Sequence, residues 1–341
     1  MDAIRTTREI LSIKSPSGQE EELACYVQEK LASLGIKCKE YAHSKTSKSI
    51  VAKTGGKEKL CINCHLDVVP YAGTPVKEDE NYLYGPGAVD TKKDIGPLLS
   101  ALSKMDEIPE GLVLAFDADE EYYNTGILAI YKDIRAPKVI INEATGLQAN
   151  YGWLGWAIAT ISARGRQMHS CYGGRGNSYN TLLGVCAKTV QSKFKKKDKL
   201  GESGVQVREM VLDPQGHTFV PPKAACKLLV LQNTHYNSPR KIAQEIGRGE
   251  KNISVGVSDF FPAHIGKRNG LAKELSLLSG RGVGLDRAWT NAHYFKERDT
   301  VIFGCGEYLR AHTNEERVPK KQLLQLEQIY LRLMEKIQKN S

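Results

Sequence analysis

An imidazole or a carboxylate side chain follows each of four short apolar runs in this sequence. The runs at 60–63, 112–118, 139–141 and 301–303 lead, in that order, to His65 and Asp67, to Glu120 and Glu121, to Glu143, and to His312. A further carboxylate, Asp90, ends the glycine-containing loop Gly85–Asp90, just before a helical pattern. Because the carboxyl ends of parallel strands meet at one edge of a sheet, we expect these side chains to converge on one crevice.

Two histidines with several carboxylates form a ligand set that zinc accepts, and carboxylates beyond three suggest two ions bridged by one of them. Two ions about 3.5–4 Å apart polarise a carbonyl group and lower the pKa of a shared water. The carboxylate that is left over would act as the general base. These residue types therefore predict metal-assisted hydrolysis.

The elements that must position these groups are indicated by the periodicity of apolar residues. Helical spacing occurs at 3–11, 20–34 and 95–105, and the four apolar runs are rich in β-forming residues. Strands that alternate with helices are typical of a mostly parallel sheet with helices on both faces. We therefore predict an α/β domain of this kind.

The middle of the chain has a different pattern. A strand, a helix, a strand and a helix are predicted in that order, at 157–163, 178–194, 226–231 and 239–246. This order indicates a smaller α+β domain, and helices at 265–278 and 320–337 return the chain to the first domain. We predict a catalytic domain of residues 1–155 and 262–341, interrupted by an inserted domain of residues 156–261.

Five stretches carry a resemblance to a known family: Cys64–Pro70, Gly85–Lys92, Asp119–Glu121, Asn142–Thr145 and Ala311–Glu315. In this order they resemble the motifs of the zinc peptidase and deacylase family of acetylornithine deacetylase, succinyl-diaminopimelate desuccinylase, aminoacylase and carboxypeptidase G. The match spans nearly the whole chain. Several ordered motifs are a specific signal, whereas one alone would be weak.

The resemblance implies two zinc ions per chain, with cobalt or manganese as substitutes. It implies that Asp90 bridges the ions, that His65 and Glu143 complete one site, and that Glu121 and His312 complete the other. Glu120 remains, and the resemblance makes it the base.

Asp67 lies two residues beyond His65 in an extended segment, so it projects to the same side. From there its carboxylate can hold the second ring nitrogen of His65 and fix the tautomer. We therefore expect Asp67 to support the ligands and not to bind metal itself.

The inserted domain carries a family-like segment, Gly165–Ser170, followed by Gly176 and Asn177. In the family, the corresponding histidine reaches into the active site of the partner subunit and stabilises the oxyanion. The resemblance implies this role for His169, and a homodimer formed through the inserted domain, which would also act as a lid. Asn177 is a candidate substrate-binding residue.

The substrate-binding half departs from the family pattern. Thr290–His293 falls where many relatives carry Ser-Asp-Ala-Arg, whose arginine holds the carboxylate of the substrate. His293 is the candidate replacement, and it would hold a carboxylate less firmly than a bidentate guanidinium. Leu231–Thr234 stands where an Asp-x-Arg pattern is usual. Pro86 replaces an arginine in the Asp90 loop, and Lys93–Asp94 replaces a glycine pair.

Composition and charge restrict the other classes of function. With 41% hydrophobic and 26% charged residues, no apolar run approaches the roughly 20 residues of a membrane span. We find no signal-peptide pattern, and the eight cysteines are scattered, so we expect a cytoplasmic protein without disulfides. The net charge of +9 favours an acidic substrate or partner, but no nucleic-acid-binding module accompanies it, so we expect no nucleic-acid or membrane partner.

The predicted function is cleavage of the amide bond of an N-acyl amino acid, as in arginine or lysine biosynthesis, or release of lysine or ornithine from an acidic amino-group carrier protein. A metallo-carboxypeptidase or dipeptidase acting on a small peptide is the first alternative. A metal-free binding module on the same fold is the second. Cys61–His65 also spells the c-type haem attachment pattern, but it lies in a predicted core strand and no export signal accompanies it.

Overall fold

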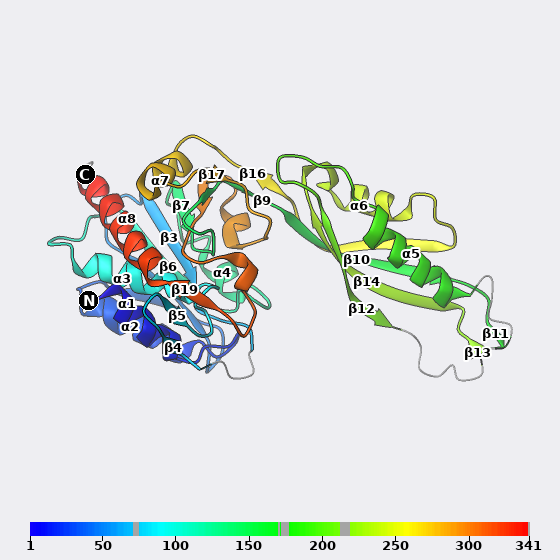
Figure 1. Cartoon of the computed structure of the whole chain (residues 1–341), viewed down its shortest axis with the longest axis horizontal. Coiled ribbons are helices and arrows are strands. Elements are labelled where there is room, and N and C mark those ends of the chain that lie inside the picture. Colours follow the sequence, from blue (N-terminus) through cyan, green and yellow to red (C-terminus); the bar gives the residue numbers. More distant parts are fainter. Residues whose placement is uncertain (71–74, 170, 172–176, 212–218, 340–341) are drawn as a thin grey trace. The chain divides into compact units, whose positions relative to one another are not determined.

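The computed structural model describes residues 1–70, 75–169, 171, 177–211 and 219–339. The chain forms two compact units (Figure 1). The larger unit comprises Met1–Tyr151, Gly266–Gly284 and Thr290–Ser341. The smaller unit comprises Gly152–Ile265 and Leu285–Trp289.

The larger unit is built on an eight-stranded sheet with the strand order β1-β2-β6-β3-β7-β18-β8-β17. The strands are β1 (Cys38–Ala42), β2 (Lys48–Lys53), β3 (Leu60–His65), β6 (Leu112–Asp117), β7 (Lys138–Ile141), β8 (Ala149–Asn150), β17 (Val283–Gly284) and β18 (Asp299–Ile302). Its centre is parallel, because β3 pairs in parallel with β6 and β7, and β18 pairs in parallel with β7. The expected α/β fold with a mostly parallel sheet is confirmed.

Every residue of β3 and β6 is buried, which explains their continuous apolar runs. Leu60, Ile62 and Cys64 face a core that is shared with five helices. These helices are α1 (Ala3–Ser12), α2 (Glu21–Ala32), α3 (Ile95–Ser103), α7 (Leu271–Ser279) and α8 (Lys320–Lys339). Alternate residues such as Cys61 point to the opposite face, where α4 (Thr125–Ile130) contacts β2 and β6 (Figure 1).

Shorter strands complete the larger unit. β4 (Lys77–Glu78), β5 (Tyr82–Tyr84) and β19 (Arg317–Pro319) form a small antiparallel sheet. Short 3-10 helices overlap or adjoin several of the predicted site segments: η1 (Lys92–Asp94), η4 (Asn291–Phe295) and η5 (Tyr308–Arg310), which directly precedes Ala311.

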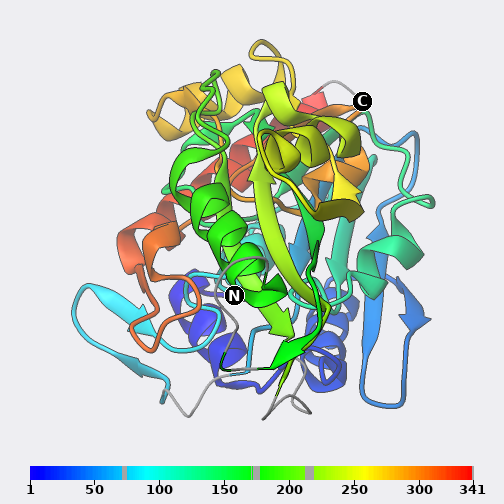
Figure 2. The same ribbon diagram turned by 90° about the vertical axis from the view of Figure 1, so that its right-hand side faces the viewer.

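The smaller unit is an antiparallel sheet of four strands in the order β12-β14-β10-β15. The strands are β10 (Gly155–Arg164), β12 (Gly204–Val211), β14 (Lys223–Gln232) and β15 (Ile253–Phe261). Burial alternates along β10, and the buried side packs on α5 (Ser178–Ser192) and α6 (Pro239–Gly247), which lie against the sheet in Figure 2. Three shorter strands and one 3-10 helix of this unit are β9 (Gly152–Trp153), β11 (Met168–His169), β13 (Phe219–Val220) and η3 (Thr234–Tyr236).

One expectation about elements was wrong at its start, and several strands were missing from the predictions. The helix expected at 265–278 begins only at Leu271, because His264–Ile265 (β16) pairs with β9 and Gly270 adopts a φ of 109° that a helix cannot contain. The strands β1, β2, β12 and β15 were not anticipated.

Among the described residues, no helix is both long enough and apolar enough to cross a membrane.

Candidate metal centre

His65 is delivered by the carboxyl end of β3, opposite Asp117 of β6 in the register of the sheet. Its side chain is buried, and its Nε2 lies 3.0 Å from Oδ1 of Asp90. Its Nδ1 lies 3.0 Å from the backbone carbonyl oxygen of Asp67 and 3.4 Å from the Asp67 carboxylate. If Nδ1–H donates to that carbonyl, Nε2 is left with the lone pair that a metal ion requires.

Asp90 faces both histidines with different oxygens. Its Oδ1 points to His65, and its Oδ2 lies 3.2 Å from Nε2 of His312. Nε2 of His312 also lies 2.8 Å from Oε1 of Glu121. Ligand atoms of His65, Asp90 and Glu121 all lie within 4.8 Å of one another. Asp90 therefore stands between two groups of ligands, as a bridging carboxylate would.

Glu143 follows β7 and is buried. Its Oε2 accepts a hydrogen bond of 3.3 Å from the hydroxyl of Tyr308, a residue that the sequence did not indicate. Burial and the nearby Asp90 carboxylate raise the pKa of Glu143 well above its usual value, although His65 opposes the shift. Glu143 thus lies within the electrostatic field of the same centre.

Asp67 holds the turn that carries the two adjacent acids. Its two carboxylate oxygens accept the backbone N–H of Glu120 at 3.0 Å and that of Glu121 at 3.1 Å. The hydroxyl of Ser17 donates to the same carboxylate at 2.6 Å. The expected support of the His65 ring therefore comes chiefly from the Asp67 backbone, and the Asp67 side chain supports the turn.

The electrostatics of these groups fit a divalent cation. Burial first, then the charges of neighbouring carboxylates, raise the pKa of Glu120 well above its usual value. Burial and Asp90 raise the pKa of Glu121 to about 7. Hydrogen bonds to Asp90 and Glu121 raise the pKa of His312 to about 11. Carboxylates gathered in a buried space repel one another, and bound cations would relieve that repulsion.

The remaining predicted site residues have ordinary local partners. His169 is exposed at the end of β11, and its Nδ1 accepts the N–H of Cys171 at 3.2 Å. Asn177 caps α5, since its Oδ1 accepts the N–H groups of Tyr179 and Asn180. His293 lies in η4 of the larger unit, edge-on to the ring of Tyr294. Ser170 and Gly176 lie outside the described residues.

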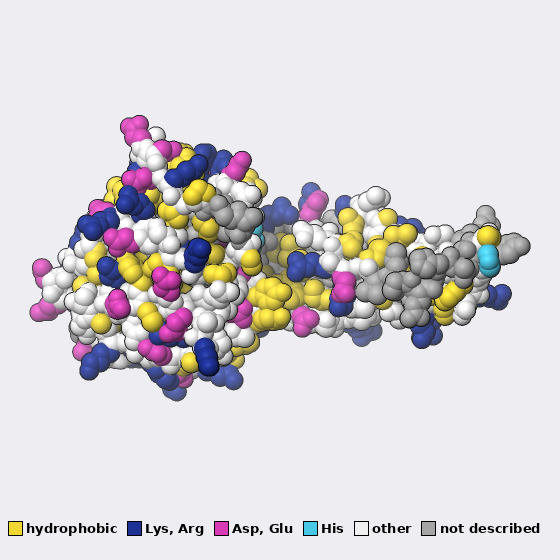
Figure 3. Space-filling model, turned by 90° about the horizontal axis from the view of Figure 1, so that it is seen from below, with side chains coloured by type: hydrophobic (Ala, Val, Ile, Leu, Met, Phe, Trp, Pro, Cys, Tyr) yellow, Lys and Arg dark blue, Asp and Glu magenta, His cyan; other side chains and the backbone are white. Residues whose placement is uncertain are grey.

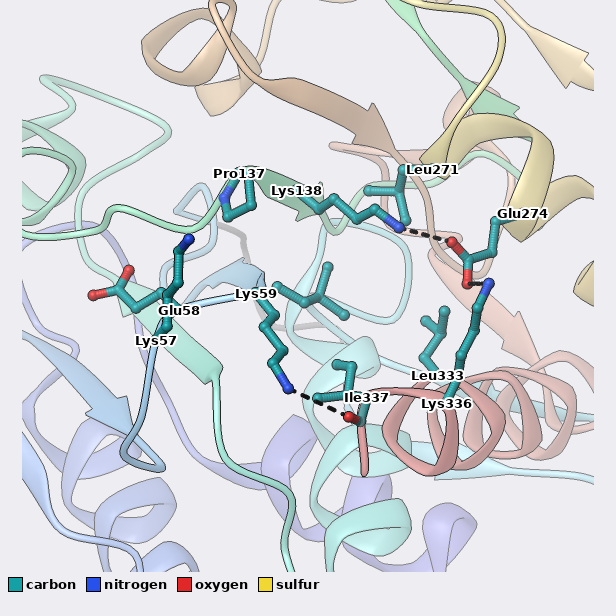
Figure 4. A pocket seen from close by; sticks show the side chains of 11 residues that line it. Lys57, Glu58, Lys59, Pro137, Lys138, Leu271, Glu274, Leu333, Lys336 and Ile337 are labelled. Carbon is teal, nitrogen blue, oxygen red and sulfur yellow. Dashed lines mark hydrogen bonds and ion pairs between the residues drawn. The ribbon is translucent and has the colours of Figure 1, made fainter. Parts of the chain in front are cut away.

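A cavity of about 370 Å³ in the larger unit lies at the amino ends of the parallel strands, opposite the carboxyl ends where the candidate ligands lie (Figure 4). It is lined by the first residues of β3 and β7, Leu60 and Lys138, whereas His65 ends β3. Lys138 and Lys336 both pair with Glu274, at 3.1 and 2.6 Å. This cavity is therefore separate from the cluster of candidate metal ligands.

The positive charge is dispersed on the face of the molecule shown in Figure 3. Lysine and arginine side chains alternate there with aspartate and glutamate over the larger unit. Elsewhere in the described chain, charged side chains form ion pairs at the surface, such as Lys39 with Asp133 and Lys53 with Glu58.

Comparison with known proteins supports the family resemblance that the sequence motifs indicate. Residues 61–336 match peptidase family M20/M25/M40. The chain belongs to this family. It is therefore an enzyme, a hydrolase of the peptidase and amidohydrolase type, and the resemblance read from the motifs is confirmed.

Among the relatives that are named LysW-lysine/LysW-ornithine hydrolase are the following two. The protein of Pyrococcus abyssi is 32% identical over 51% of this chain and 49% of its own length. That of Pyrobaculum aerophilum is 27% identical over 93% of this chain and 92% of its own length. A Bacillus subtilis structure, described as a dinuclear metal binding peptidase from the M20 family, shares the fold with a TM-score of 0.67 and 12% identity, over 98% of each chain.

Proposed function

We propose that this enzyme hydrolyses the amide bond of an N-acylated amino acid, and that its substrate is lysine or ornithine linked to a carrier protein. The proposed hydrolytic activity rests on the placement of Asp90 between His65 and His312. The names of these two relatives support the proposed identity of the substrate. The net charge of +9 would speed encounter with an acidic carrier.

The metal-binding roles follow the geometry and the family resemblance. Asp90 would bridge two ions, His65 and Glu143 would hold one, and Glu121 and His312 would hold the other. The mixture of imidazole and carboxylate ligands suits zinc, and cobalt or manganese could replace it. When bound, such ions polarise a carbonyl group and acidify a water molecule.

Glu120 is the proton carrier in this proposal. It accepts a proton from the attacking water and returns it to the leaving nitrogen as the amide C–N bond breaks, so the products are an amine and a carboxylate. Its raised pKa suits both steps, because a carboxyl group with a pKa nearer neutrality can take up a proton and release it again. Asp67 keeps Glu120 in place through the Glu120 backbone N–H.

The smaller unit has a proposed role in assembly and substrate binding. We infer a homodimer formed through this unit, in which His169 of one chain stabilises the oxyanion in the site of the other. His293 would replace the usual arginine as the group that meets the substrate carboxylate. Both roles rest on the family resemblance. We also propose that the enzyme is located in the cytoplasm.

A panel of substrates tests the proposal. The purified enzyme is depleted of metal with a chelator, reloaded with Zn²⁺, Co²⁺ or Mn²⁺, and assayed on N-acetylornithine, N-succinyl-diaminopimelate, a set of dipeptides and lysine linked to the carrier. We expect the highest kcat/KM on the carrier-linked substrate and no turnover without metal. Faster turnover of dipeptides would favour a dipeptidase. A protein that binds no metal and is inert to the whole panel would be a binding module.

A further inference from the structure

Glu316 is a buried carboxylate that the chemistry proposed above does not use. It is 1% exposed and lies four residues after His312, directly before β19. β19 pairs with β5 so that Arg317 lies opposite Tyr84, and the N–H of Gly85 donates to the backbone carbonyl of Glu316. This pairing brings Glu316 against the loop that presents Asp90.

The carboxylate of Glu316 joins two loops. Its Oε2 accepts the backbone N–H of Gly87 at 2.9 Å and that of Val89 at 3.2 Å. Its Oε1 accepts the backbone N–H of His312 at 3.0 Å. The Glu316 side chain thus connects the segment directly before Asp90 to His312, the second histidine of the candidate site.

Both loops adopt conformations that need such support. His312 has a φ of 60°, in the left-handed region that residues other than glycine seldom occupy. Gly87 has a φ of 81°, and a side chain there would collide with the packed chain of Lys92. The ligands at the ends of these loops, Asp90 and His312, approach to 3.2 Å.

We propose that Glu316 is a positioning residue that sets the placement of Asp90 relative to His312, and thereby the affinity of the metal site that these two share. The inference rests on the proposed metal centre. Glu316 does not act as a ligand, because both of its oxygens are occupied by backbone N–H groups.

The test compares Glu316→Gln with Glu315→Gln. At position 316 the amide keeps the size of the side chain but turns one acceptor oxygen into an NH₂ group that faces a backbone N–H. Glu315 is the matched control: its side chain is 82% exposed and meets Arg310 at 3.4 Å. Titration calorimetry of metal-free protein with Zn²⁺ should show binding weakened by about 10–100-fold in Glu316→Gln, the usual effect of losing a group that orients ligands, and unchanged in Glu315→Gln.

Hydrogen exchange of the metal-free proteins gives a second measurement. Peptides that contain residues 85–90 and 311–313 should exchange faster in Glu316→Gln. A purely structural defect would instead lower the melting temperature and leave the metal affinity of the folded protein unchanged. Zinc binding within twofold of the wild type would overturn the inference. If Glu316→Gln does not fold, Glu316→Asp, which is too short to reach both loops, is measured against the same criterion. If wild-type protein binds no metal, the proposed function fails, and unchanged exchange in both peptides would independently refute the link between the loops.

Discussion

Glu120 and Glu121 are adjacent in sequence, but the proposed function gives them different tasks. Oε1 of Glu121 lies 2.8 Å from Nε2 of His312, within the candidate ligand cluster. Glu120 has a strongly raised pKa, for which burial is the largest cause. At the scale of single residues, the proposed function therefore gives the role of proton carrier to one acid and that of ligand to the next residue along the backbone.

The first prediction distinguishes these two acids by substitution. Glu120→Gln should keep its metal and lose turnover by about 10²–10⁴-fold, because the missing group is a proton acceptor. Glu121→Gln should bind one ion more weakly, and added Zn²⁺ should restore part of its activity. Titration calorimetry and kcat measurements over a range of zinc concentrations check both. Weak metal binding in Glu120→Gln with intact binding in Glu121→Gln would reverse the two roles.

Buried carboxylates organise the loops at the carboxyl edge of the sheet. Glu20 accepts the N–H of Asp119, a residue with a φ of 60°, at 3.2 Å, and Asp67 accepts the next two N–H groups along the same turn. Asp117, at the end of β6, accepts the side-chain amide of Asn63 from β3 and that of Asn291 from η4, both at 2.6 Å. At the scale of elements, these acids connect the ends of neighbouring strands to one another and to segments that are distant in the sequence.

The second prediction concerns the pH dependence that Asp117 imposes. Burial raises the pKa of Asp117 to about 6, from an ordinary value of 3.8. The folded protein therefore binds this proton more tightly than the unfolded chain, so the stabilisation is complete below pH 3.8 and is lost as the pH rises through 6. Asp117→Asn removes this dependence. Urea unfolding of metal-free protein from pH 4 to 7 should show the stability of the wild type, relative to Asp117→Asn, falling by about 2–2.5 kcal/mol. A difference that does not change with pH would contradict the assignment.

The third prediction concerns the packing of α3, the helix that follows the Asp90 loop. A Cβ at Gly96 would meet the hydroxyl oxygen of Thr7 on α1 and come within 2.7 Å of its backbone nitrogen. Gly96→Ala should therefore destabilise the protein by about 1–3 kcal/mol through overpacking. The control is Gly184 in α5, which is exposed and has nothing within 4 Å of its Cβ position, so Gly184→Ala should stabilise by about 0.5–1 kcal/mol. Thermal unfolding of both variants checks the pair, and equal effects would show that the contact with Thr7 is unimportant.

The fourth prediction concerns the whole molecule and the proposed dimer. Chains that carry His169→Ala are mixed with chains that carry Glu120→Gln, each almost inactive alone. If His169 acts across the dimer, a mixed dimer contains one site with both groups intact, so activity should recover to as much as half of the wild-type value per mixed dimer. Activity is measured after unfolding and refolding the mixture, with the mixed dimers isolated by two affinity tags. No recovery in isolated mixed dimers would refute the action of His169 in a partner chain.

The sequence by itself predicted the chemistry of the proposed centre and determined the order in which its candidate groups appear. His65, Glu120, Glu121 and Glu143 follow buried strands, and a buried parallel strand has a strong local signature because both of its faces are apolar. The family motifs then indicated a role for each group. The helix expected at 265–278 failed at its start, because the pairing of β16 with β9 depends on a segment more than a hundred residues away.

Only the tertiary structure decided how these groups face one another. The opposed contacts of the two Asp90 oxygens, the backbone carbonyl that meets His65 and the two loops joined by Glu316 depend on segments far apart in the sequence. Residue types are visible in a sequence because each strand end has its own local pattern. Hydrogen bonds from a carboxylate to the backbone of a distant loop leave no such pattern, because every residue except proline offers the same N–H.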